Sequence, residues 1–257
     1  MNNKEKNLPL SKKVKQTKHI TIMGQYYKAV ILDKDTNPNE TIIVKQAFSS
    51  YDYDWNGAKL MEHSYVGNWF VKAVEHALYH YYDGYPFVWC GDYADEKCGV
   101  SVYEKACEWM DKAKEEFALA NGYTRVKNAS FGREWDKDGE CVGSVSLVEK
   151  IPYEEFETYK FIINYDKKQF IRIPEKVQGK LTIHPLPLLC ADGNQRGGGD
   201  YYGRNETLVG AWAYDRIGID NELPEDITTE LVAVFEESWG DNTKNVDDYK
   251  YVERVLD

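Results

Sequence analysis

Eight apolar residues recur at helical spacing early in the chain, and this stripe constrains the fold more than any other feature. They are three or four positions apart, at Val66, Trp69, Phe70, Ala73, Val74, Ala77, Leu78 and Tyr81. This spacing places all of them on one face of a helix. Such a face must pack against another element, and the helix is expected to end near Asp83-Gly84, with Pro86 just beyond.

A second helix is predicted over Ser101–Ala120, and short β-branched and aromatic runs predict strands elsewhere. The second helix carries its apolar stripe at Val102, Ala106, Trp109, Met110, Ala113 and Phe117. Two hairpins are expected, Tyr26–Leu32 with Thr41–Phe48 and Tyr159–Tyr165 with Gln169–Ile173, and single strands within Phe87–Cys90, Cys141–Val148, Thr207–Ile219 and Glu230–Phe235. Hairpin-linked strands with helices grouped in one half predict an α+β fold, with a mostly antiparallel sheet and two main amphipathic helices.

Composition divides the chain into four stretches. Residues 1–22 hold six lysines and one acidic residue, so this N-terminal tail carries +5 while the rest carries −16. Residues 23–127 form a half with both helices, residues 141–239 a β-rich half, and residues 240–257 a polar C-terminal tail. The two halves could form one domain. The Lys-rich tail is expected to be solvated or to dock on an acidic surface.

The net charge of −11 argues against direct binding to nucleic acid, which calls for a basic domain. No stretch reaches the roughly 18 apolar residues of a membrane span, so no membrane partner is expected. The five cysteines are odd in number and lack CxxC spacing, which favours reduced thiols in a cytoplasm. The sequence leaves the oligomeric state open.

The most unusual stretch is His184–Arg204, the glycine-rich segment, which contains five glycines among polar residues. Three glycines in a row are entropically costly, which favours a backbone that must approach another molecule closely. Free N–H groups and arginines there could hold an anion, with an aromatic ring stacking on it. The candidate ligand-binding residues are His184, Asn194, Arg196, Gly197, Gly198, Gly199, Tyr201, Arg204 and the nearby Trp212. A long hairpin loop without a ligand is the structural alternative.

The same residues leave two other functions open. Asp192 and Asp200 could hold Mg²⁺ in a metal-dependent phosphoester or nucleotide hydrolase, with His184 as general base or ligand. The segment lacks the Gly-Lys-Ser/Thr of a phosphate-binding loop. The second helix carries an acidic row, Glu104, Glu108, Asp111 and Glu115, which could imitate a nucleic-acid backbone and act as a decoy for a host protein.

Smaller clusters have more ordinary interpretations. His76 and His80 have the i, i+4 spacing of two-histidine metal sites, but they lie on the polar side of the predicted helix and are expected at the surface. Cys90 is expected to be a buried structural thiol. Tyr51 and Tyr53 alternate with acids, a pattern that suits either stacking on a partner or packing in a half-buried strand.

Four stretches resemble a group of uncharacterised proteins carried by phages and gut bacteria. They are Met23–Val30, Lys59–Ser64, His184–Leu189 and Gly197–Tyr201. The resemblance covers most of the chain from Met23 onward and implies a mobile-element context, in which small acidic proteins often modulate host machinery or defence. It brings no catalytic residues. We therefore expect a non-enzymatic binding protein of phage or mobile-element origin in the bacterial cytoplasm, engaging a host protein or a small anionic molecule, with counter-defence as one such role.

Overall fold

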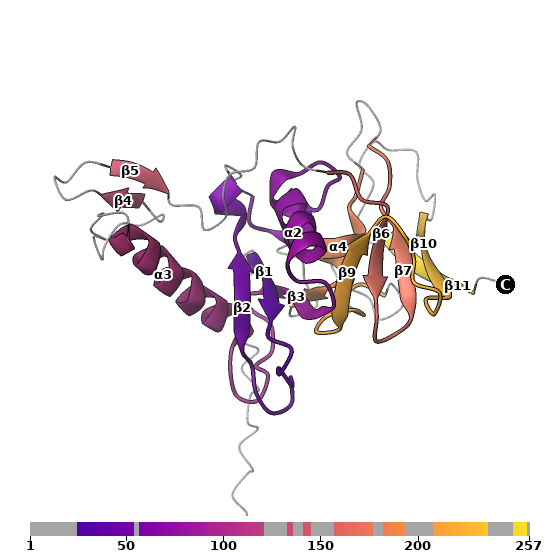
Figure 1. The fold of residues 1–257 in the computed structure, drawn as a ribbon, viewed down its shortest axis with the longest axis horizontal. Helices are drawn as coiled ribbons and strands as arrows, with labels where there is room; N and C mark the ends of the chain where they lie inside the picture. Colours follow the sequence, from indigo (N-terminus) through magenta and orange to yellow (C-terminus); the bar gives the residue numbers. More distant parts are fainter. Residues whose placement is uncertain are drawn as a thin grey trace, which may run out of the picture.

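The computed structural model describes residues 25–53, 57–120, 133–135, 141–144, 157–176, 182–193, 208–235 and 249–255. A nine-stranded sheet runs through it in the order β11-β10-β7-β6-β9-β3-β1-β2, with β8 also paired to β3 (Figure 1). The strands are β1 Tyr27–Leu32, β2 Val44–Phe48, β3 Tyr85–Gly91, β6 Phe161–Asn164, β7 Gln169–Arg172, β8 Ala191–Asp192, β9 Arg216–Asp220, β10 Thr229–Phe235 and β11 Tyr249–Val255. Among the strand pairs that the structure describes, only β3–β8 and β7–β10 are parallel, so the predicted α+β fold with a mostly antiparallel sheet is confirmed. A separate antiparallel pair joins β4 (Arg133–Trp135) and β5 (Cys141–Ser144).

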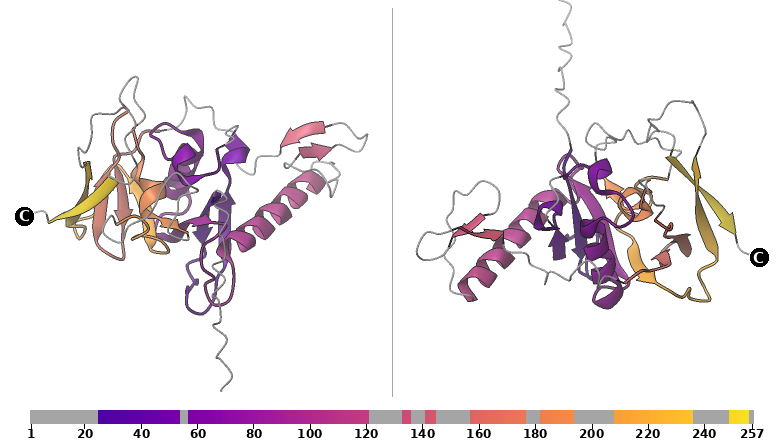
Figure 2. Two further views of the ribbon diagram at one scale, coloured as in Figure 1. Left: turned by 180° about the vertical axis from the view of Figure 1, so that it is seen from behind. Right: turned by 90° about the horizontal axis from the view of Figure 1, so that it is seen from above.

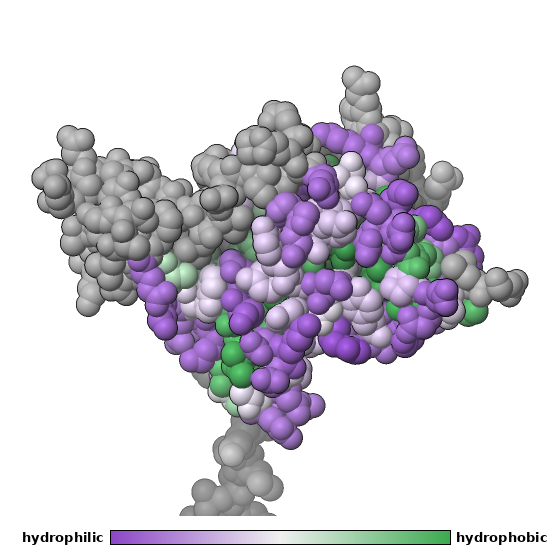
Figure 3. Space-filling model, viewed as in Figure 1, coloured by the Kyte–Doolittle hydropathy of each residue, from purple (hydrophilic) through white to green (hydrophobic). Residues whose placement is uncertain are grey.

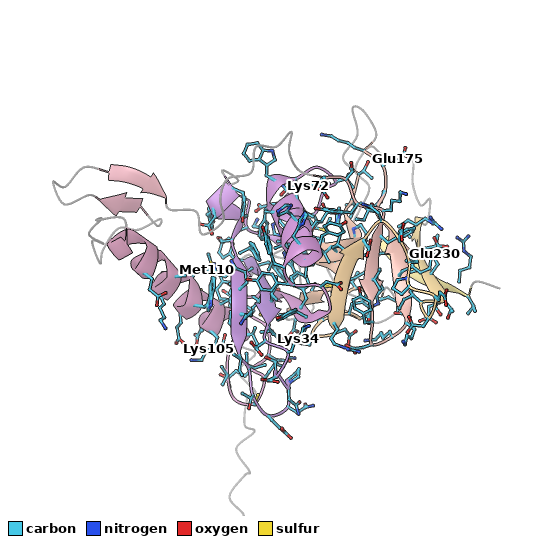
Figure 4. All side chains as sticks on the ribbon, viewed as in Figure 1. Lys34, Lys72, Lys105, Met110, Glu175 and Glu230 are labelled. Atoms are coloured by element: carbon cyan, nitrogen blue, oxygen red, sulfur yellow. The ribbon has the colours of Figure 1, made fainter. Side chains whose placement is uncertain are left out.

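The two main helices, α2 (Trp69–His80) and α3 (Val102–Ala120), cover opposite faces of the sheet. In β1, Ala29 and Ile31 point into the core beneath α2, whereas Val30 and Leu32 point into the core beneath α3. Because successive side chains of a strand point to opposite faces of the sheet, β1 contributes residues to both cores. Figure 2 shows α3 extending beyond the sheet toward β4 and β5. In Figure 4, Met110 lies on the part of α3 nearest β2.

Three short helical elements complete the described fold, and one of them corrects the sequence analysis. They are η1 (Ser50–Tyr53), α1 (Leu60–His63) and α4 (Pro185–Leu189). The two prolines of α4 predict an extended chain, but proline is tolerated in the first helical turn, where its missing N–H has no partner in any case. His184 caps this helix by accepting the Leu186 N–H at 3.3 Å.

Other boundaries also differ from expectation. α2 begins at Trp69 instead of Val66 because the Asn68 side chain caps it, accepting the N–H groups of Phe70 and Val71. β11 lies within the predicted polar tail of residues 240–257 and pairs along β10. Since β3 from the first half pairs with β9 from the second, the two predicted halves share one sheet.

A buried carboxylate ties the last strands together. Glu230 in β10 is 3% exposed and accepts hydrogen bonds from Arg172 Nε of β7 at 2.9 Å and Arg254 Nε of β11 at 3.1 Å (Figure 4). Burial raises the pKa of Glu230, but the two guanidinium groups outweigh it and hold that pKa below its usual range. One carboxylate therefore joins three neighbouring strands through two charge-assisted contacts.

The surface facing the viewer in Figure 3 is mostly hydrophilic, with small apolar areas over the β1–β2 hairpin and near β6 and β7. Among the described residues, no helix combines the length and the apolar character needed to cross a lipid bilayer.

His63, the last residue of α1, lies inside the core against α2 and β3. His63 Nε2 accepts the Trp89 indole N–H at 2.8 Å, and Nδ1 faces the Gly57 carbonyl oxygen at 3.2 Å. The indole donates only to an unprotonated nitrogen, so the ring is neutral and its proton is on Nδ1. Burial lowers the pKa of His63 to about 3, against a smaller opposing effect of the Gly57 hydrogen bond.

This histidine predicts an acid-sensitive fold. The unfolded chain takes up a proton on His63 below about pH 6.5, whereas the folded chain does so only near pH 3. The free energy of unfolding should therefore fall by up to about 1.4 kcal/mol per pH unit as pH drops through this window. In His63→Gln, which retains an acceptor for Trp89, urea denaturation at several pH values should show a shallower fall. Parallel curves for the two proteins would contradict the assignment.

Candidate functional site

Strand β3 divides one of its edges between two partners. Its first residues, Tyr85 and Pro86, pair with β9, and its last, Trp89 and Cys90, pair with β8. The other edge pairs with β1 along five residues. β8 lies inside the glycine-rich segment and is only two residues long, so its pairing with β3 fixes where the rest of that segment leaves the sheet.

The departure point is packed closely against the start of β1. A Cβ added to Gly193 would lie 2.6 Å from Tyr27 Oη and 2.7 Å from Gln25 Oε1. These two side chains are buried, and Tyr27 donates to Gln25 Oε1 at 2.9 Å. Only glycine leaves room for this contact, so the backbone at Gly193 must approach the sheet without a side chain.

The described chain resumes at residue 208 and packs against the residues just before Gly193. The Gly210 N–H donates to the Leu188 carbonyl at 2.8 Å, and the Trp212 N–H donates to Leu189 at the same distance. A Cβ on Gly210 would lie 2.6 Å from the Ala191 carbonyl oxygen. The described residues on the two sides of 194–207 therefore lie against one another, and connections held at both ends in this way are frequently functional.

A polar trio joins the two ends. Asp192 at the departure accepts the Tyr214 hydroxyl at 2.6 Å and forms an ion pair with Lys97 at 3.2 Å. The Lys97 ammonium also lies 5.1 Å from the centre of the Tyr214 ring. Burial raises the pKa of Tyr214, and Cys90 and Asp192 add to the effect, so its hydroxyl stays protonated and donates. An ion pair and a hydrogen bond thus hold Asp192, just before residues 194–207, to Tyr214, which follows them; we call this junction the clamp.

Left-handed backbone conformations gather at this clamp. Tyr214 has a φ of 70°, Leu208 of 58° and Cys98, beside Lys97, of 45°. Such values are strained for residues with side chains and persist only where surrounding contacts impose them. Strain of this kind concentrates at functional sites, which makes the trio and its two chain ends the candidate functional site.

The structure places His184 in the core and not at an exposed site. It is 1% exposed, and its Nε2 lies 2.8 Å from Glu75 Oε1 of α2. Nδ1 accepts the Leu186 N–H, so Nε2 carries the proton and donates it to Glu75. Burial acts to raise the pKa of Glu75, but His184 and Lys72 outweigh it and hold that pKa below its usual range. With both nitrogens occupied, His184 has no free position for a ligand or for proton transfer.

Trp212 differs in the same way from the stacking role predicted for it. Its ring is completely buried, and Nε1 donates to Gln169 Oε1 at 2.8 Å. A ring without exposed surface has no face to offer a ligand, so Trp212 instead fixes the returning chain on β7. Lys97, Tyr214 and Gln25, which sequence reasoning did not single out, do contact the segment's ends.

The remaining candidates fall outside the described residues: Asn194, Arg196, Gly197, Gly198, Gly199, Asp200, Tyr201 and Arg204. The predicted Asp192–Asp200 pair therefore stays a prediction. Across the described ranges, no group of three or more His, Cys, Asp or Glu residues lies close enough to hold a metal ion. His76 is partly buried and His80 exposed, with ring centres 4.2 Å apart. Cys90 is completely buried, and burial raises its pKa.

Comparisons with protein-family models, curated proteins and solved structures give no match.

Gly210 and Gly99 form a matched pair that tests the close approach of the chain ends. Both have a left-handed φ, 78° and 72°, but nothing lies within 4 Å of a Cβ on Gly99. Alanine at Gly99 should cost about 1 kcal/mol of unfolding free energy, from backbone strain alone. Gly210→Ala should cost roughly 1–3 kcal/mol more, because a backbone oxygen cannot move aside easily. Equal losses in urea denaturation would show that the contact with Ala191 is unimportant.

The double role of His184 predicts a graded response. In His184→Asn, the side chain can still cap α4 but cannot reach Glu75, and we expect a loss of about 1–3 kcal/mol. His184→Ala also removes the cap and should lose about 1 kcal/mol more. Chemical denaturation followed by tryptophan fluorescence measures both. If the two variants were equally stable, the cap would contribute nothing.

Proposed function

We propose that this protein is a non-enzymatic binding protein that engages a host protein or a small anionic molecule through the glycine-rich segment. The observation that carries the proposal is the clamping of residues 194–207 at both ends, where Asp192, Lys97 and Tyr214 meet. A stretch rich in glycine and arginine that is joined at both ends to a packed sheet is typical of many binding loops.

The contacts of Asp192 at the clamp and of His184 in the core support binding over catalysis. Asp192 is occupied by a hydroxyl and an ammonium group, and His184 by Glu75 and the Leu186 N–H. Neither is poised to accept a proton from a substrate.

The cellular setting is part of the same proposal. The resemblance to phage and gut-bacterial proteins supports a mobile-element origin and a partner from the bacterial host. Cys90, Cys98, Cys107 and Cys190 are free thiols, in keeping with a reducing cytoplasm.

The proposal is tested by replacing Arg196 and Arg204 together with alanine. Tagged wild-type and variant proteins would be used to capture proteins and small molecules from a bacterial lysate, with quantitative mass spectrometry of both. We expect a component captured by the wild type to be reduced about tenfold or more with the double variant, because charge-assisted hydrogen bonds would be lost.

A matched control removes two positive charges elsewhere. Lys160 and Lys176 are exposed near β6 and β7, and Lys160→Ala with Lys176→Ala changes the net charge equally. This control should capture the component as the wild type does. Equal capture by all three proteins would mean that the arginines of the glycine-rich segment do not bind the partner.

A further inference from the structure

A second surface lies where β1 begins and β3 ends. Tyr26 and Tyr51 are 44% and 50% exposed. Asp92 is locked to Tyr26 by two hydrogen bonds: its N–H donates to the Tyr26 carbonyl at 2.9 Å, and its Oδ1 accepts the Tyr26 N–H at 3.0 Å. In the antiparallel β1–β2 pair, Ala29 lies opposite Phe48, so Tyr26 before β1 and Tyr51 after β2 lie at the same end of the hairpin. Tyr26, Tyr51 and Asp92 are called the tyrosine surface below.

Tyrosine rings already hold ammonium groups elsewhere in this molecule. Lys34 Nζ lies 4.5 Å from the centre of the Tyr85 ring. Directly beside the tyrosine surface, Lys28 Nζ lies 5.1 Å from the centre of the Tyr103 ring. The negative face of an aromatic ring attracts a cation, most strongly where water is partly excluded. Tyr26 and Tyr51 present the same kind of ring to the outside.

The charge around the tyrosine surface is suited to a cation. Asp92 forms no ion pair within 4 Å among the described residues. Burial raises its pKa, and the Tyr26 N–H and the more distant charge of Lys28 offset only part of that effect. The first turn of α3 adds the exposed carboxylate of Glu104, which is not paired with a described lysine or arginine. A cation seated here would satisfy a partly desolvated carboxylate and gain two ring contacts.

We propose that the tyrosine surface binds a lysine- or arginine-rich segment of a partner protein. The exposed rings contact the side-chain cations, and Asp92 supplies the compensating charge. The inference rests on the proposed function only in that both describe a partner-binding protein. It uses different residues and a cationic probe, so either proposal can fail while the other stands.

The test measures binding of fluorescein-labelled hexalysine to the full chain by fluorescence anisotropy, with hexa-acetyllysine as the neutral control. Tyr26→Ala with Tyr51→Ala should raise the Kd about tenfold, and Asp92→Asn, which keeps the acceptor for Tyr26, about threefold. Tyr26→Phe with Tyr51→Phe retains both rings and should stay within about threefold of the wild type. Circular dichroism checks that each variant is folded.

Two matched controls separate this surface from general attraction to an acidic protein. Tyr81 is 69% exposed and lies near the opposite end of β3, and Asp95 is an exposed acid in the next loop. Tyr81→Ala and Asp95→Asn should each change the Kd by less than about twofold. Equal effects of Asp92→Asn and Asp95→Asn, or an unchanged Kd in the paired alanine variant, would overturn the proposal.

The chain's own Lys-rich residues 1–22 are the competing occupant, because they join the described fold at Gln25, next to Tyr26. A full-length variant with glutamine at Lys4, Lys6, Lys12, Lys13, Lys15 and Lys18 distinguishes the two. Equal binding of hexalysine by wild type and variant supports a separate partner. Binding by the variant alone would overturn that assignment in favour of the chain's own segment.

Discussion

The pairing of β3 with three other strands is the constraint on which the rest of the structure depends. Every residue of β3 after Tyr85 is buried, so neither edge nor face is open to water. One edge binds β1, and the other joins β9 and then β8. Since β9 also pairs with β6, this single strand connects the N-terminal hairpin to the C-terminal sheet. The position of the glycine-rich segment follows from the same pairing, because β8 lies within that segment and pairs with β3.

Local sequence patterns were sufficient to predict the elements near the centre of the fold. The Tyr26–Leu32 and Thr41–Phe48 hairpin, the Tyr159–Ile173 hairpin and both main helices are present. Each has a strong periodicity or a turn signal within a few residues. The helix at Pro185–Leu189 was missed because its cap is a histidine side chain, which is not among the usual capping residues. β11 was missed because charged residues are interspersed along its sequence, so it lacks an apolar run. It forms a strand by pairing with β10, which a local pattern does not reveal.

The candidate site was harder to predict for a different reason: its contacts join residues far apart in the sequence. His184 was singled out as a site residue, but its partner Glu75 lies in α2, 109 residues earlier in the chain. A signal was present, because Glu75 lies four residues after Val71 and three before Leu78, within a row of buried positions. Asp192 likewise meets Lys97 and Tyr214 only once β3, β8 and the turn before β9 are assembled. No spacing rule within one element carries that information.

The close contact of Gly210 with Ala191 allows the described residues to be treated as a frame and residues 194–207 as an insertion into it. The frame closes on itself through Ala191, Leu188 and Leu189, whatever lies between residues 194 and 207. Lengthening such an excursion costs little loop entropy, since each doubling of its length adds only about 0.6 kcal/mol. Related chains could therefore exchange this stretch for others of different size and chemistry while every strand register stays the same. Recognition would then diversify at one exit from the sheet, with the scaffold left unchanged.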